Sequence, residues 1–187
     1  MSAIITEKFR QHNATQFYES FTEASKSTYY LFIGKSTAFT TATTTGSDSS
    51  PPTPADAVGE TEYYAWDSML AAKNIASSDV TYALPRRNWT NGTIYDMYKH
   101  NISSSSTSTS GASNLYDSTF YFLTSDNRVY KVLDNNSGAA YSGSEPTSES
   151  TSPFALGGYV LKYMYSVTSA EAAKYLTTDY MPVSTDT

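Results

Sequence analysis

Apolar positions along the chain form four periodic blocks, and three polar tracts separate them. The tracts cover residues 36–56, 101–114 and 135–153 and consist largely of Ser, Thr, Pro, Asn and Gly. Loops beyond about 12 to 15 residues are uncommon in compact domains and are usually functional or disordered. Few apolar side chains in the tracts could offset the entropy of ordering them. We therefore interpret them as surface arms that neighbouring chains order.

The first block predicts a helix followed by a strand. A helix is expected over residues 6–21, because apolar side chains recur at multiples of four positions on one stripe: Ile5, Phe9, Phe17 and Phe21. Residues 28–33 are β-branched and aromatic on both faces. This composition predicts a strand that is covered on two sides.

The second block predicts a helix and a short extended run. Residues 61–75 are expected to be helical, with an apolar face made by Tyr63, Trp66, Met69 and Leu70. The run over 80–84 ends at Pro85, which biases its predecessor toward an extended conformation. Residues 90–93, Thr-Asn-Gly-Thr, are typical of a turn.

The last two blocks predict a hairpin, a long strand and a short helix. Residues 119–123 and 128–133 flank the turn-prone Ser125-Asp126-Asn127. An aromatic strand follows over 159–167, and Thr168 with Glu171 matches a capping box for a helix that ends near Tyr175. The fold class expected from the pattern is mainly β with helical insertions (α+β).

Composition and charge narrow the possible functions. The length of 187 residues fits one domain or two small ones, and there are 29 Ser, 26 Thr and 17 Tyr but only 12 Lys and Arg. A net charge of −6 argues against nucleic-acid binding, which needs clustered basic residues. The longest apolar run, residues 29–33, is far shorter than the roughly 20 residues of a membrane span, so no membrane partner is expected. The N-terminal residues lack an apolar signal region, so Sec export is not expected.

Candidate catalytic and metal-binding residues are few. The absence of Cys excludes disulfides and thiolate chemistry and fits a reducing cytosol, and two His, at positions 12 and 100, are too few for most histidine-based metal sites. There is no Gly-x-Ser-x-Gly nucleophile motif, and the spacing of acidic residues identifies no carboxylate pair for glycoside hydrolysis. We expect a protein that is not an enzyme and has no cofactor and no metal.

One compact basic and aromatic cluster stands out as a candidate partner-binding site. It consists of Arg86, Arg87 and Trp89, and Arg and Trp are favoured at interface hot spots. An arginine at such a position equally pairs with a carboxylate inside its own chain. The sequence leaves both interpretations open.

Five segments, in order along the chain, resemble one known family. They are residues 4–10 (Ile-Ile-Thr-Glu-Lys-Phe-Arg) with Phe17-Tyr18, residues 32–36 (Phe-Ile-Gly-Lys-Ser), residues 85–89 (Pro-Arg-Arg-Asn-Trp), residues 129–134 (Val-Tyr-Lys-Val-Leu-Asp), and residues 158–160 (Gly-Tyr-Val) with Tyr163 and residues 178–180. The chain resembles the N-terminal half of the baseplate wedge protein of T-even-like contractile-tail phages, the gene product eight family. The motif at 85–89 is the most specific.

The resemblance implies a structural role without catalysis. It implies a β-sandwich-like domain over residues 1–187, with the three tracts as long Ser/Thr-rich loops, that forms a homodimer and contacts other baseplate wedge proteins. It further implies a location in the virion tail baseplate, with assembly in the host cytoplasm. The family protein continues beyond the point that matches Pro182 and carries Cys, and the tracts have no counterpart in it.

Two interpretations of the surface follow. In the first, a tyrosine-rich sheet surface and the long loops bind neighbouring wedge subunits, because Tyr combines apolar area with a hydroxyl group and loses few rotamers on contact. In the alternative, the chain is a glycan- or receptor-binding tail adhesin whose exposed aromatic rings stack on sugars.

Overall fold

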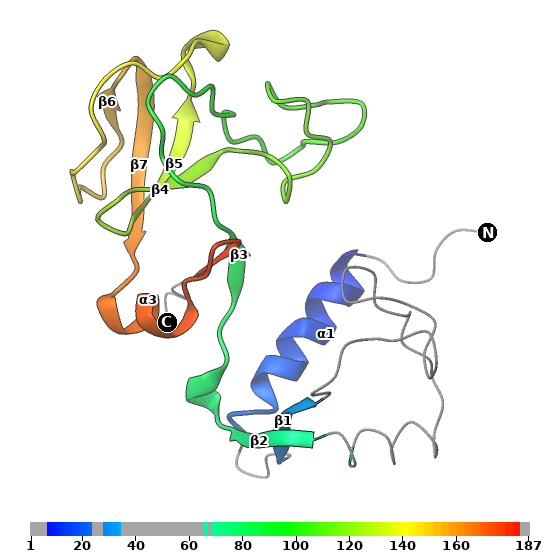
Figure 1. Ribbon diagram of the computed structural model, residues 1–187. Coiled ribbons are helices and arrows are strands. Elements are labelled where there is room, and N and C mark those ends of the chain that lie inside the picture. The colour runs from blue at the N-terminus through cyan, green and yellow to red at the C-terminus, as the bar shows by residue number, and fades with distance from the viewer. Residues whose placement is uncertain (1–6, 24–27, 35–65, 67–68, 184–187) are drawn as a thin grey trace, which may run out of the picture. The chain divides into compact units, whose positions relative to one another are not determined.

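The computed structural model describes residues 7–23, 28–34, 66 and 69–183 (Figure 1). The chain divides into two compact units, Met1–Val80 and Thr81–Thr187, which are described separately below. The polar tract 36–56 and the first part of the helix expected at 61–75, apart from Trp66, lie outside the described residues.

The described part of the first unit includes helix α1 and an antiparallel pair of strands. Helix α1 (Glu7–Glu19) confirms the predicted helix, and it is followed by β1 (Tyr29–Gly34), β2 (Met69–Ile75) and the single 3-10 turn η1 (Ser77–Asp79). The buried Phe21 ring lies 4.6 Å from the Tyr29 ring and 5.1 Å from that of Phe17. These aromatic contacts connect the end of the helix to the start of β1.

Two expectations for this unit are wrong. Residues 69–75 form strand β2 and not the second half of a helix, since they pair with β1 from Tyr29↔Ile75 onward. Their apolar spacing fits either period, and cross-strand pairing overrides the helix propensity of Leu, Ala and Lys. Strand β1 is not covered on both sides either, because Leu31 and Ile33 are each 62% exposed.

A four-stranded antiparallel sheet forms the centre of the second unit (Figure 1). Its order is β4 (Tyr121–Leu123), β5 (Arg128–Asp134), β7 (Tyr159–Ser166) and β6 (Phe154–Leu156). The predicted hairpin β4–β5 and the predicted aromatic strand β7 are confirmed. The hairpin turn places Asn127 at φ 60°, a left-handed conformation that Asn tolerates.

A two-stranded ribbon and a short helix complete the second unit. Strand β3 (Ala83–Pro85) pairs antiparallel with β8 (Tyr180–Pro182), and α3 (Ser169–Tyr175) precedes β8. The predicted capping box is confirmed, because Thr168 Oγ1 accepts from Glu171 N while the Glu171 carboxylate accepts from Thr168 N. A single 3-10 turn, η2 (Asn136–Gly138), follows β5.

The sheet buries both of its faces. One face packs against loop residues, in a cluster that comprises Tyr95, Phe122, Tyr130, Val132, Tyr141, Tyr159 and Leu161. The other face packs against the ribbon and α3, in a cluster that comprises Tyr121, Leu123, Val129, Val167 and Met181, with Leu84, Ala172 and Leu176 beside it. The fold is therefore mainly β with helical insertions, as the sequence predicts.

A bulge in β7 places two tyrosines that are two positions apart on opposite faces of the sheet. Tyr130 pairs with Tyr163 and its neighbour Val129 pairs with Tyr165, so Met164 is an extra residue between the pairs. The inserted residue changes which face the following side chains occupy. Tyr163 consequently packs with the first cluster and Tyr165 with the second.

In the four-stranded sheet, the tyrosines expected at the surface lie mainly in the core, whereas Tyr30 on β1 and Tyr180 on β8 are exposed. Tyr130 and Tyr159 have no exposed surface, and Tyr141 is only 1% exposed. Their hydroxyls find partners inside the unit, because each donates to a backbone carbonyl: Ser148 for Tyr130, Ala139 for Tyr159 and Ser144 for Tyr141. Burial of a tyrosine is favourable only when its hydroxyl is paired in this way.

Candidate functional site

The segment that carries Arg86, Arg87 and Trp89 runs along the edge of the sheet. Trp89 N donates to Leu123 O at 2.8 Å and Leu123 N donates to Arg87 O at 2.7 Å, so the segment lies parallel to β4. It begins directly after Pro85, the last residue of β3. The backbone of this segment therefore links the ribbon to the sheet, and its side chains are held in fixed positions.

Arg86 reaches the loop that precedes β8. Its Nε donates to Asn88 Oδ1 at 2.8 Å, and its Nη1 donates to the Thr177 carbonyl at 2.9 Å. Its backbone N donates to the Asp179 carbonyl at 2.7 Å. The side chain thus fixes the C-terminal loop 177–179 beside the sheet edge.

Arg87 points to a different part of the second unit. Its Nη2 donates to the Tyr116 carbonyl at 2.8 Å, and its guanidinium carbon lies 5.4 Å from the centre of the Tyr121 ring. Tyr121 donates its hydroxyl to the Pro85 carbonyl at 2.8 Å. Burial raises the pKa of Tyr121, and the nearby Arg87 opposes that rise.

Trp89 packs inward. Its ring meets the Tyr141 ring edge to face, with 5.9 Å between centres and an angle of 89°. The indole Nε1 is buried and has no hydrogen-bond partner among the described residues, and the same is true of Arg87 Nε. Trp89 therefore packs mainly into the core. The two arginines lie partly exposed at the edge of the sheet.

The two arginines bind carbonyl and amide oxygens. In the part of the chain that the structure describes, neither forms an ion pair with a carboxylate. Among the described residues, their charges therefore face neutral oxygens and, for Arg87, the ring of Tyr121.

Two exposed tyrosines lie beside the arginines, and the sequence pattern does not indicate them. Tyr116 is 60% exposed and Tyr180 is 49% exposed, and a hydrogen bond between the two side chains raises the pKa of Tyr116. Tyr116 supplies the carbonyl that Arg87 binds, and Tyr180 pairs with Pro85 in the ribbon. We name Arg86, Arg87, Tyr116 and Tyr180 the Arg–Tyr patch. Its members come from three separate stretches of sequence, so no local pattern signals it.

Contacts within the chain hold the polar tract 101–114. The Asp96 carboxylate is fully buried and accepts from Ser110 N and Oγ, Ser118 Oγ and Thr119 N, all between 2.7 and 2.9 Å. Burial by itself would raise the pKa of Asp96, but these hydrogen bonds outweigh it and lower the pKa to about 2. A single carboxylate thus orders a loop that has almost no apolar side chains.

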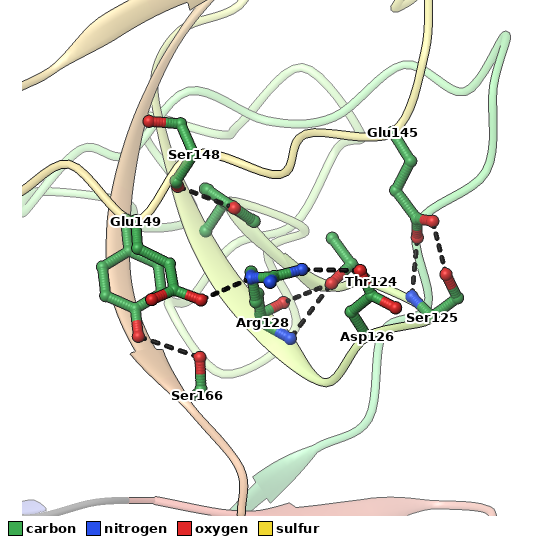
Figure 2. A network of polar contacts seen from close by, with 10 residues as sticks. Thr124, Ser125, Asp126, Arg128, Glu145, Ser148, Glu149 and Ser166 are labelled. Atoms are coloured by element: carbon green, nitrogen blue, oxygen red, sulfur yellow. Dashed lines mark hydrogen bonds and ion pairs between the residues drawn. The ribbon is translucent and has the colours of Figure 1, made fainter.

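Acidic side chains fasten the polar tract 135–153 to the hairpin. Figure 2 shows Glu145 accepting from Ser125 N and Oγ, at 2.7 and 2.6 Å, and Glu149 accepting from Arg128 Nε at 2.7 Å. Arg128 also binds Asp126 on the hairpin turn. The expectation that neighbouring chains alone order the tracts is therefore wrong for the two tracts described.

Other candidate chemistry is sparse in the described residues. His12 on α1 and His100 in a turn are both exposed, and no group of three His, Cys, Asp or Glu that could hold a metal occurs in 7–23, 28–34, 66 and 69–183. Neither helix of the described part is long and apolar enough to cross a bilayer.

A comparison with protein-family models matches residues 3–142 to the family described as Bacteriophage T4, Gp8. The chain belongs to the Gp8 family. The match contains four of the five segments that carry the resemblance, including the arginine motif at 85–89, and ends before the fifth at 158–160. No curated protein matches the chain.

Membership of the Gp8 family gives the chain a structural role in a phage baseplate wedge. The Arg–Tyr patch contains the two arginines of the matched segment at 85–89, together with Tyr116, which also lies in the matched region.

Proposed function

We propose that this chain is a wedge subunit of a contractile phage tail that contacts other wedge subunits during assembly and in the virion. The match to the Gp8 family over residues 3–142 carries this proposal. Its two compact units act together as one wedge-type subunit, which is assembled in the host cytoplasm and forms a homodimer. The molar mass of the purified chain in solution tests the dimer.

The Arg–Tyr patch is the proposed contact surface on the second unit. Arg and Tyr are enriched at the centres of interfaces, where one desolvated anchor contributes much of the binding energy. The arginines are held by hydrogen bonds at 2.8 and 2.9 Å, so little side-chain entropy is lost when a partner binds. Trp89, the third residue of the candidate site, contributes indirectly, because its ring packs on Tyr141 in the core and so anchors the segment that carries the two arginines.

Substitution of the exposed tyrosines tests this contact. Tyr116→Ser and Tyr180→Ser remove exposed rings at little cost in stability, and we expect each to reduce recovery of the chain in purified tail baseplates at least about tenfold, as for interface hot spots. Tyr30→Ser, at an exposed tyrosine of the first unit, is the matched control. Normal recovery of both patch variants would contradict the assignment of this surface.

Isolation of intact tails tests the wedge role itself. The chain should co-purify with baseplate proteins and should crosslink to them. Its presence only at a fibre tip, combined with saturable glycan binding by the isolated chain, would favour the adhesin alternative.

A further inference from the structure

A pocket opens between the sheet and the ribbon of the second unit, and none of the four Arg–Tyr patch residues lines it, although Tyr121, the ring that Arg87 contacts, does. Its volume is about 250 Å³, and its walls include Leu84, Phe120, Val129, Met164, Tyr165 and Val183. Met164, the extra residue of the β7 bulge, is 47% exposed, so the pocket is reached from solvent. The pocket is therefore apolar inside and open outside.

Its size favours a single side chain over a cofactor or a sugar. Pockets for small molecules and cofactors usually measure roughly 300 to 1,000 Å³, above the volume found here. An aromatic or large aliphatic side chain that enters such a pocket is the usual anchor of a protein contact.

One lysine ammonium stands at the pocket without a carboxylate. Lys131 lines the pocket, and its Nζ lies 3.3 Å from the centre of the Tyr98 ring. Lys162 is its cross-strand partner, so two like charges face each other on one side of the sheet. Among the described residues no carboxylate forms an ion pair with either lysine.

The electrostatics of this pair favour an anionic occupant. Burial lowers the pKa of Lys131, and the charge of Lys162 lowers it further. An added carboxylate would relieve the repulsion and gain a charge-assisted hydrogen bond in a partly desolvated place. The apolar walls and two ammonium groups that have no carboxylate partner among the described residues together define one kind of ligand.

We propose that this pocket binds an acidic segment of a partner chain, with one large apolar side chain inside the pocket and a neighbouring carboxylate on Lys131 and Lys162. The inference deepens the proposed wedge role and rests on it for the origin of the segment, another baseplate chain. The pocket adjoins the Arg–Tyr patch through Tyr121, so a partner segment in the pocket would extend the contact surface proposed for the second unit.

Methyl NMR of the full chain with synthetic peptides tests the proposal. The probe is Ser-Glu-Phe-Asp-Ser, and the matched peptides are Ser-Lys-Phe-Lys-Ser, which reverses the charge, and Ser-Glu-Ser-Asp-Ser, which lacks the apolar side chain. We expect the probe alone to shift the methyl signals of Val129, Met164 and Val183 saturably. Equal shifts with either matched peptide, or no shift with the probe, would overturn the proposal.

Three variants locate the contact. Lys131→Glu should weaken binding of the probe at least about tenfold, because it replaces attraction by repulsion. Met164→Trp should block binding by filling the entrance without disturbing buried side chains. Lys99→Glu makes the same charge change at an exposed lysine outside the pocket lining and should alter the affinity less than about twofold, as expected for a screened surface charge. A folded Lys131→Glu variant with unchanged affinity would refute the assignment.

Two further measurements decide between occupants. A fall in molar mass from dimer to monomer in Lys131→Glu would show that a second copy of this chain occupies the pocket. A zero-length crosslink from Lys131 to a carboxylate of the same chain, at monomer mass, would give it to the chain itself. Either result overturns the proposal. If the probe fails to bind while the chain is still found in baseplates, only the pocket proposal fails. If the probe binds but the chain is not found in baseplates, only the wedge role is refuted.

Discussion

Asp96 illustrates how one residue can organise a loop that hydrophobic burial cannot order. Its carboxylate is acceptor to four donors, three of them from Ser110 and Ser118 side chains or the Ser110 backbone. One serine of tract 101–114, Ser110, thus binds a buried charge through both its backbone and its side chain. Charge-assisted hydrogen bonds of this kind are about twice as strong as neutral ones.

Asp96→Asn should destabilise the second unit by about 2 to 4 kcal/mol, because an amide cannot accept all four bonds and its NH₂ group meets donors. Urea unfolding measures this loss. The control, Asp117→Asn, changes an exposed carboxylate that accepts from Asn114 and should cost less than about 0.5 kcal/mol. Equal effects in the two variants would contradict the role given to Asp96.

Because the pKa of Asp96 is low in the folded state, part of the free energy of unfolding depends on pH. Because the folded pKa of about 2 lies below the ordinary value of 3.8, the stabilisation is complete above about pH 4 and is lost as the pH falls through 2. The difference corresponds to about 2 kcal/mol at 1.36 kcal/mol per pH unit. Urea midpoints between pH 4 and 2 should fall more steeply in the wild type than in Asp96→Asn. Parallel curves would show that another group carries the acid dependence.

At the scale of elements, buried tyrosine hydroxyls and glycine turns position the tract 135–153. Gly157, at φ 62° between β6 and β7, lies against the Tyr141 ring so closely that an added Cβ would come within 2.6 Å of it. Gly92 has φ 81° but nothing within 4 Å of such a Cβ. The two glycines share the backbone conformation and differ in their surroundings.

Gly92→Ala should cost about 1 kcal/mol, the usual penalty for a left-handed alanine. Gly157→Ala should cost a further 1 to 3 kcal/mol, approximately, because the buried ring must move. Thermal unfolding of both variants measures the difference. If the two variants lose equal stability, backbone strain alone explains the losses, and the contact with Tyr141 adds no cost.

Tyr130→Phe should open the tract locally without unfolding the sheet. The variant loses the 2.8 Å hydrogen bond to the Ser148 carbonyl, worth about 1 kcal/mol. Amide hydrogen exchange over 142–153 should become faster while the sheet amides keep their protection. Tyr116→Phe, at an exposed ring, should change neither.

The sequence predicts elements well where the signal is local. The hairpin at 121–134, strand β7 and the Thr168 cap all depend on neighbouring residues, and all are confirmed. Strand β2 was not predicted because Met69–Ile75 becomes a strand only through pairing with β1, far away in sequence. The sequence pattern indicates the cluster Arg86–Trp89. It cannot indicate the partners of the two arginines, because Tyr116 lies 29 residues from Arg87 and Thr177 lies 91 residues from Arg86.

At the scale of the whole molecule, the second unit contains a complete core. Both hydrophobic clusters are built from residues between Leu84 and Met181, and the sheet, the ribbon and α3 all lie in Thr81–Thr187. The pocket lined by Lys131 and the Arg–Tyr patch belong to the same unit. Its stability should not require the first unit.

A fragment of residues 81–187 should therefore fold by itself. Its backbone NMR spectrum should overlay the signals of the same residues in the full chain, and its unfolding should be cooperative. A collapsed fragment without near-ultraviolet circular dichroism would show that the first unit supplies contacts that the second needs.

The edge-to-face packing of Trp89 on Tyr141 supplies an intrinsic optical reporter. The chain has two tryptophans, and Trp66 is 65% exposed whereas the Trp89 indole N–H is buried. In a Trp66→Phe background, the remaining tryptophan fluorescence comes from one ring packed on the core, and Tyr141 lies close enough to transfer excitation energy to it. Detachment of tract 135–153, which carries Tyr141, would weaken that transfer and move the emission to longer wavelength. Opening of this tract during assembly thus becomes observable in real time without any label.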